Sequence, residues 1–202
     1  MTDTVMVDIR GEVAVVTLNR PETANTLNLA MGRDLLTAAL RCEADPAVRA
    51  VVLTGAGKAF CFGGDLRGMT SSGTPIEPYL KELTTHLHAA IARFMRMDAP
   101  VIAAVNGTTA GAGVGLVAMA DLAIMAAGAK ISLAYTGVGL TPDGGTSFLL
   151  PRAVGAKRAM ELIMTNRALT AAEALEWGLV NQVAPDTEVL DTALALAGEI
   201  CE

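Results

Sequence analysis

Residues 99–145 have the sequence APVIAAVNGTTAGAGVGLVAMADLAIMAAGAKISLAYTGVGLTPDGG, and this stretch decides the fold. The apolar run at 101–105 has the length and the β-branched content of a buried strand. It is followed by a glycine-rich turn, a helix of small residues, a second apolar run, and a second glycine-rich turn that carries Asp143. We expect the two glycine-rich turns to face one pocket.

The turn at 111–115 leaves almost no side-chain bulk at the point where a helix is expected to begin. The first N–H groups of a helix have no partner within the helix and lie at the positive end of its dipole. A carbonyl oxygen placed at Ala112 would therefore be held while it gains negative charge. The alternative interpretation is close packing of a helix on a strand. The spacing does not match the nucleotide-binding GxGxxG motif, because the final glycine is out of register and no acidic ribose ligand follows at a suitable distance.

The composition indicates one folded domain. The chain has 202 residues, of which 52% are hydrophobic and 18% are charged, so it can bury a substantial core. A net charge of −6 and a pI near 4.9 argue against nucleic acid or a membrane surface as the main partner. The sequence does not start with a basic segment followed by an apolar one, and no apolar run reaches membrane-spanning length. We therefore predict a soluble, cytoplasmic protein with neither a nucleic-acid nor a membrane partner.

Residues that commonly bind metals are sparse. Cys42, Cys61 and Cys201 are widely spaced without a CxxC pair, which is typical of a reducing compartment. His86 and His88 are the only histidines, so we predict no metal site. Helical spacing places these two histidines on different sides of one helix, and a structural or exposed role is favoured over catalysis for each.

The hydrophobic periodicity predicts an α/β pattern of strand-then-helix units along the rest of the chain. The expected strands are 4–9, 13–18, 49–54 and 179–183. The expected helices are 29–43, 80–97, 156–164, 170–177 and a last one from 187 onward. Asn28 is the expected N-cap of the first helix, and Thr170 with Glu173 has the spacing of a capping box. We expect 70–78 to be a mobile surface loop that acts as a lid.

One face of the helix at 29–43 is expected to be buried. The helical period puts four apolar side chains on that face, Leu35, Leu36, Ala39 and Leu40.

The segment CFGGDLRGM at 61–69 repeats the arrangement of the central turn. It follows a strand and places Gly63 and Gly64 before an acidic residue, Asp65, at the first turn of a helix. Alone, this pattern is a helix start with an N-terminal aspartate. Together with NGTTAGAG it supplies two separate backbone N–H groups, from Gly64 and Ala112. These would form an oxyanion hole that stabilises the enolate of a thioester carbonyl.

The order and spacing of these motifs resemble the crotonase superfamily, the enoyl-CoA hydratase/isomerase family, over nearly the whole chain. The segments that carry the resemblance are NRPETANTLN, VVLTGAGKAFCFGGDL, PVIAAVNGTTAGAGVGL, AYTGVGLTPDGG, LPRAVGAKRAMEL and EALEWGLVNQV. The resemblance implies an α/β fold, a crotonase-like spiral of ββα units, with 1–184 as its core. Residues 185–202 are then the start of a C-terminal helical region. The resemblance implies that this region continues further, and thus that the chain is truncated.

The resemblance also implies the substrate and the assembly. It implies an acyl-CoA thioester, with coenzyme A as part of the substrate and no separate cofactor, and a homotrimer or a dimer of trimers. The substrate-binding residues that it implies are Ala24, Gly63, Asp65, Leu66, Arg67 and Tyr135. The sequence itself favours a capping role for Asp65, and it leaves open whether Arg67 and Lys58 contact the CoA phosphates or only solvent.

The acidic residues of this chain depart from the hydratases that it resembles. Those enzymes carry one catalytic glutamate in the helix after the second oxyanion glycine and another before the second glycine-rich turn. Alignment of the motifs places Gly115 and Tyr135 at these two positions. Hydration needs acids and bases that position water and handle its protons, so a site without both glutamates should be a poor hydratase.

Asp143 is the remaining candidate base. The resemblance places an aspartate there in some double-bond isomerases, in ring-epoxide isomerases and in 4-chlorobenzoyl-CoA dehalogenases. Isomerisation needs only one base, which removes an acidic proton and returns it elsewhere on the same enolate. Turn chemistry is the alternative explanation, because Pro-Asp-Gly-Gly is typical of a tight turn. We predict an isomerase with Asp143 as base and with Gly64 and Ala112 as the oxyanion hole.

Three alternatives remain open at this point. One is a residual hydratase. Another is a dehalogenase, although those enzymes pair the aspartate with a tryptophan where this chain has Tyr135, and with a histidine that His86 or His88 would have to match. The third is a non-catalytic acyl-CoA-binding or assembly subunit, which an Asp143 side chain pointing away from the oxyanion pair would favour.

Overall fold

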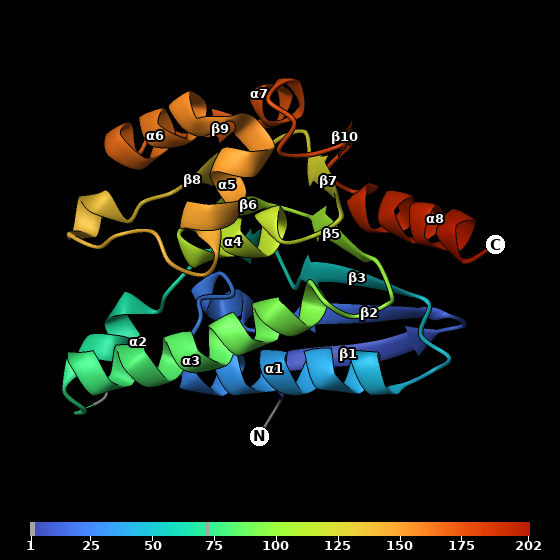
Figure 1. The fold of residues 1–202 in the computed structure, drawn as a ribbon, viewed down its shortest axis with the longest axis horizontal. Coiled ribbons are helices and arrows are strands. Elements are labelled where there is room, and N and C mark those ends of the chain that lie inside the picture. Colours follow the sequence, from blue (N-terminus) through green and yellow to red (C-terminus); the bar gives the residue numbers. More distant parts are fainter. Residues whose placement is uncertain (1–2, 72) are drawn as a thin grey trace.

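The computed structural model describes residues 3–71 and 73–202, whose strands form two sheets (Figure 1). The larger sheet has six strands in the order β1 (Val5–Arg10), β2 (Val13–Leu18), β3 (Ala50–Gly55), β5 (Val101–Val105), β7 (Leu122–Ala126) and β10 (Gln182–Ala184). The smaller sheet has the order β4 (Ala59–Cys61), β6 (Thr108–Ala110), β8 (Lys130–Ser132) and β9 (Leu169–Thr170). The pairs β1–β2 and β8–β9 are antiparallel, and the other neighbours are parallel.

Helices follow these strands. They are α1 (Leu29–Ala44), α2 (Leu66–Ser71), α3 (Ile76–Phe94), α4 (Ala112–Ala118), α5 (Thr146–Val154), α6 (Ala156–Thr165), α7 (Ala171–Glu176) and α8 (Val189–Cys201), with short 3-10 turns η1 (Pro21–Thr23) and η2 (Thr136–Val138). None of the helices in the described part of the chain combines the length and the apolar character needed to cross a bilayer.

A strand–strand–helix unit recurs along the chain. The successive units are β3–β4–α2, β5–β6–α4 and β7–β8–α5, the last with η2 before its helix. The strands β3, β5 and β7 are neighbours in the larger sheet, and β4, β6 and β8 are neighbours in the smaller one. Each unit is therefore displaced by one strand from the unit before it, which confirms the predicted spiral of ββα units.

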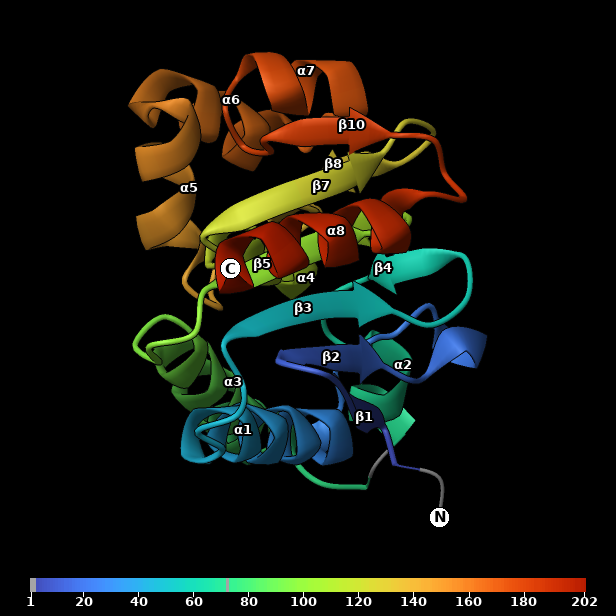
Figure 2. The ribbon, with the colours of Figure 1, turned by 90° about the vertical axis from the view of Figure 1, so that its right-hand side faces the viewer.

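The main core lies around the larger sheet. The strands β3 and β5 are buried along their whole length, as continuous apolar runs in a parallel sheet predict. In Figure 2, α8 crosses the face of this sheet over β5. The buried side chains of α8 belong to the same core cluster as those strands. The boundary at 184/185 stays a prediction.

The helix α1 begins as predicted, but its buried face differs. The Asn28 side chain accepts a hydrogen bond from the Met31 N–H at 2.9 Å, which fixes the N-terminus of the helix. Leu40 is 45% exposed, whereas Leu35 and Cys42 are buried. The expected face was therefore wrong at Leu40, because the stripe that packs on the core runs through Met31, Leu35 and Cys42.

The predicted loop at 70–78 is shorter than expected. The helix α2 extends through Ser71, and α3 begins at Ile76. Pro78 lies in the first turn of α3, where the backbone N–H has no acceptor within the helix, so proline does not break the helix there. Ser72 lies outside the described residues, and the lid remains a prediction.

The last predicted strand, 179–183, was placed too early. The N–H groups of Leu179 and Val180 donate to the carbonyl of Ala174 at 2.9 and 3.3 Å, so these residues close α7 instead of pairing in the sheet. The ladder with β7 starts only at Gln182. The predicted capping box of α7, Thr170 with Glu173, is confirmed.

Candidate active site

The turn between β4 and α2 presents the backbone N–H of Gly64. The Leu27 N–H donates to the Gly63 carbonyl at 2.7 Å, and the Asp65 N–H donates to the Leu27 carbonyl at 2.9 Å. Gly64 lies between these two groups. In such a parallel bridge it directs its own N–H away from Leu27. Within the described residues this N–H has no hydrogen-bond partner.

The turn between β6 and α4 lies directly against the first one. Its strand β6 pairs with β4, so both turns leave the same edge of the smaller sheet. Gly111 has φ +52°, and the Ala112 N–H that follows opens α4 without a partner in the described chain. A Cβ added to Gly63 would lie 3.0 Å from the Ala112 nitrogen. The backbones of the two turns therefore touch, and only glycine fits at Gly63.

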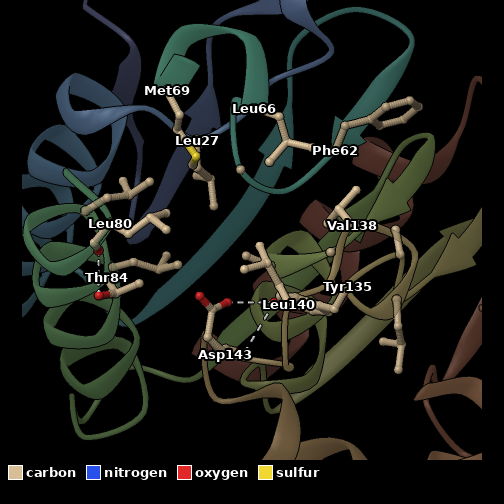
Figure 3. Close-up of a pocket in the computed structure, with 17 residues that line it drawn as sticks. Leu27, Phe62, Leu66, Met69, Leu80, Thr84, Tyr135, Val138, Leu140 and Asp143 are labelled. Carbon is tan, nitrogen blue, oxygen red and sulfur yellow. Dashed lines mark hydrogen bonds between the residues drawn. The ribbon is translucent and has the colours of Figure 1, made fainter. Parts of the chain in front are cut away.

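Both turns line one cavity with about 660 Å³ of free space, its open mouth included. Aliphatic and aromatic side chains form most of its wall, among them Leu27, Phe62, Leu66, Met69, Leu80 and Leu140 (Figure 3). Gly64 and Ala112 belong to the same wall. Among the described residues, the lining side chains with polar groups are those of Thr84, Tyr135 and Asp143. Gly111, Ala112 and Asp143 all line this cavity, so the prediction that the turn at 111–115 and the second glycine-rich turn, which carries Asp143, face one pocket is confirmed.

Asp143 lies on the wall that the second glycine-rich turn supplies. Gly144 and Gly145 follow it with φ +54° and +76°, and the Thr146 N–H donates to the Asp143 carbonyl at 2.9 Å. These positive φ values need glycine and turn the chain sharply into α5. Figure 3 shows the carboxylate pointing into the cavity. Asp143 is therefore both a residue of a tight turn and a residue of the pocket wall.

The Tyr135 hydroxyl holds the Asp143 carboxylate. It donates a hydrogen bond to Asp143 Oδ1 at 2.8 Å, and the tyrosine is 6% exposed. Burial first, and then the adjacent negative charge of Asp143, raises the pKa of Tyr135 well above its ordinary value. The phenol therefore stays protonated and acts as a neutral donor to the carboxylate.

The two histidines have different surroundings. The Gly144 N–H donates to His88 Nε2 at 3.1 Å, so His88 supports the turn that carries Asp143. His86 Nε2 lies 3.9 Å from a carboxylate oxygen of Glu82 on the same helix. Neither histidine lines the cavity.

Gly115 has no room for any side chain. A Cβ at this position would lie 2.1 Å from the Gly144 carbonyl oxygen and 3.1 Å from Thr146 Oγ1. The backbone of the turn after Asp143 therefore fills the space where the family resemblance expects a glutamate in hydratases.

We expect Gly115→Ala to lower the free energy of unfolding by about 1–3 kcal/mol, the usual cost of overpacking. The matched control is Gly198→Ala in α8, where an added Cβ meets nothing within 4 Å. It should raise stability by about 0.5–1 kcal/mol, because alanine is the better helix former. Urea unfolding of both variants measures the difference. Equal stability of G115A and wild type would contradict the close approach at Gly144.

The model of the enoyl-CoA hydratase/isomerase family matches residues 8–202. The chain belongs to the enoyl-CoA hydratase/isomerase family. It is 38% identical to the 1,2-epoxyphenylacetyl-CoA isomerase of Escherichia coli K12 over 198 residues, which are 98% of this chain and 76% of that protein. It is 38% identical to a 4-chlorobenzoyl coenzyme A dehalogenase of Arthrobacter over 172 residues, 85% of this chain and 62% of the dehalogenase.

A solved structure agrees with this family assignment. The crystal structure of an enoyl-CoA hydratase from Bacillus anthracis matches with a TM-score of 0.92 and 34% identity, over 98% of this chain and 76% of that one. Relatives of this hydratase/isomerase family member thus carry the names of three different reactions, so its own reaction has to be argued from the site.

The other substrate-binding residues expected of a family member lie near the first turn. Asp65 Oδ1 accepts from the Gly68 N–H at 2.9 Å, and Asp65 Oδ2 pairs with Arg20 at 3.0 Å. Asp65 therefore orders the turn, as the sequence favours. Ala24 has φ +54°, and its carbonyl accepts from the N–H of Phe62 in the first turn. Arg67 is exposed on α2.

Two features of this hydratase/isomerase site were not predicted from the sequence. Tyr135 was expected among the substrate-binding residues, but its hydrogen bond to Asp143 was not expected. The absence of a glutamate at Gly115 was expected, but not the Gly144 carbonyl that fills its space. The two glycines after Asp143, Gly144 and Gly145, are the sequence signal that could have predicted this close approach of the backbone to Gly115.

Proposed function

We propose that this family member is an acyl-CoA isomerase that moves a double bond, or rearranges a ring epoxide, through an enolate held by the Gly64 and Ala112 N–H groups. One observation carries the proposal. Asp143 is the acidic residue of the described chain that lines the cavity, and the two unpaired N–H groups lie in the same wall.

The proposed reaction moves one proton and one double bond. Asp143 removes a proton from C2 of a 3-enoyl thioester, and the electron pair of that C–H bond becomes part of a dienolate. The thioester oxygen carries the negative charge between the two N–H groups, whose fixed dipoles stabilise it. Asp143 then returns the proton to C4, which leaves the double bond between C2 and C3.

The same geometry disfavours hydration. Adding water needs a group that positions and activates it, yet Gly115 and Tyr135 stand where the hydratase glutamates are expected. The Gly144 carbonyl occupies the space beside Gly115, and the cavity wall is mostly apolar. These observations support transfer of a proton within the substrate over addition of water.

The remaining parts of the proposal concern binding. We propose that the apolar wall takes the acyl group and that CoA lies along Ala24 and Gly63–Arg67. No cofactor beyond the CoA of the substrate is needed, because the reaction changes no oxidation state. A homotrimer or dimer of trimers in the cytoplasm remains part of this proposal.

Product analysis with matched substrates tests the function. We expect 3-hexenoyl-CoA to give 2-hexenoyl-CoA and expect 2-hexenoyl-CoA to give no 3-hydroxyacyl-CoA. Conversion of 1,2-epoxyphenylacetyl-CoA alone would assign the ring-epoxide form of the reaction. Hydration as fast as double-bond migration would contradict the proposal.

Two further outcomes would replace the proposal. Chloride release from 4-chlorobenzoyl-CoA would assign the dehalogenase alternative, in which Asp143 attacks the ring. In the part of the chain that the structure describes, no feature favours that reaction over isomerisation, because His88 accepts a hydrogen bond from Gly144 and does not line the cavity. Tight binding of CoA esters with no turnover of any of these substrates would favour the non-catalytic alternative.

A further inference from the structure

The polar groups of the cavity are paired in a specific way. The hydroxyl of Thr84 donates to the Leu80 carbonyl of its own helix at 2.7 Å. The Tyr135 hydroxyl instead donates to Asp143 Oδ1, from the start of η2 to the second glycine-rich turn. The hydrogen bond therefore joins two separate segments of the wall through the group that is proposed to act as base.

We propose that Tyr135 is a positioning residue for Asp143, which fixes one carboxylate oxygen so that the other stays free to take the proton. This inference rests on the proposed function of Asp143. A buried hydroxyl that donates to a carboxylate stabilises its charged form and restricts its rotation. Tyr135 thus holds the base in one orientation before the substrate arrives.

The surroundings of Tyr135 favour donation to Asp143. Thr146 is completely buried, and its hydroxyl has no hydrogen-bond partner at bonding distance in the described residues. The Thr146 hydroxyl lies near the Tyr135 oxygen and lowers the pKa of the tyrosine. This effect offsets only part of the rise that burial causes. In the described chain no stronger acceptor competes with Asp143 for the Tyr135 proton.

Within the described residues, hydrogen bonds join two titratable side chains to Asp143 or to the residue after it. Tyr135 donates to the Asp143 carboxylate directly. His88 accepts a hydrogen bond from the N–H of Gly144, the residue after Asp143. A pH profile must therefore separate the carboxylate from His88. The variant His88→Gln removes the titrating ring and keeps an acceptor for the Gly144 N–H.

The test is the pH dependence of kcat/KM for Tyr135→Phe against wild type. The matched control is Tyr79→Phe, which changes a tyrosine that is also 6% exposed but does not line the cavity. In Y135F we expect the acidic limb of the profile to move to higher pH, because the carboxylate loses a hydrogen bond that favours its charged form. We expect kcat to fall about 10-fold with KM nearly unchanged. Y79F should keep the wild-type limb.

The outcomes separate this inference from the proposed function. Activity that survives Asp143→Asn overturns the function itself. If D143N is inactive but Y135F, shown to be folded by its thermal unfolding, keeps the wild-type limb and kcat, the function stands and the positioning role of Tyr135 is wrong. Loss of the limb in H88Q would assign it to His88 and would also overturn the inference.

Discussion

Asp143→Asn is expected to lower kcat for double-bond migration by about 10³-fold, the usual contribution of a positioned general base. The amide keeps the size of the side chain but takes up no proton from C2 of the substrate. Tyr135 can still donate to the amide oxygen, so the turn should keep its shape. KM should change little, because the pocket wall and the oxyanion groups remain in place. Steady-state kinetics with 3-hexenoyl-CoA measure both constants.

The matched control is Asp186→Asn. Asp186 is also an aspartate at a turn, and its Oδ1 accepts from the Gly128 N–H at 2.8 Å, but it does not line the cavity. This variant should keep wild-type kcat. A D143N enzyme within a few-fold of wild type would show that the proton leaves by another route.

Ala112→Pro should lower kcat by about 10²–10³-fold, the effect of removing one oxyanion donor. Proline deletes the N–H at the first residue of α4, a position where helices accept proline because that N–H has no intrahelical partner. The substitution should therefore remove the oxyanion donor while α4 still forms. Kinetics together with thermal unfolding measure the two effects separately.

The control at this position is Ala112→Gly, which keeps the N–H and should retain activity. Activity near wild type in a folded A112P enzyme would mean that the Ala112 N–H does not bind the oxygen. Activity near wild type in both variants would place the oxyanion hole elsewhere in the molecule.

Much of the fold was predictable because its elements depend on local pattern. The buried runs at β3 and β5, the cap at Asn28 and the capping box of α7 each follow from a few adjacent residues. Their order predicted an α/β pattern of strand-then-helix units. The spiral, which places Gly64 and Ala112 at one edge of the smaller sheet, was predicted from the family resemblance. The two glycine-rich turns of 99–145 predicted that Asp143 shares a pocket with Ala112, and the family resemblance predicted its role as base.

The missed features depend on contacts between separate structural elements. The exposure of Leu40 is set by which face of α1 packs on the core, and the local periodicity leaves that choice open. The contact of Gly115 with the Gly144 carbonyl depends on how closely α4 and the second turn approach. The Tyr135–Asp143 hydrogen bond likewise requires both η2 and that turn to be in place.

Hydrogen exchange at the substrate tests the central claim most directly. Wild-type enzyme is incubated with 3-hexenoyl-CoA in D₂O beside D143N, and mass and NMR spectra locate the deuterium. The account predicts that wild type gives 2-hexenoyl-CoA with deuterium at C2 or C4 in a part of the molecules, because the base exchanges its proton with solvent in some turnovers. D143N should catalyse neither exchange nor migration. Exchange at C2 that persists in D143N would contradict Asp143 as the base.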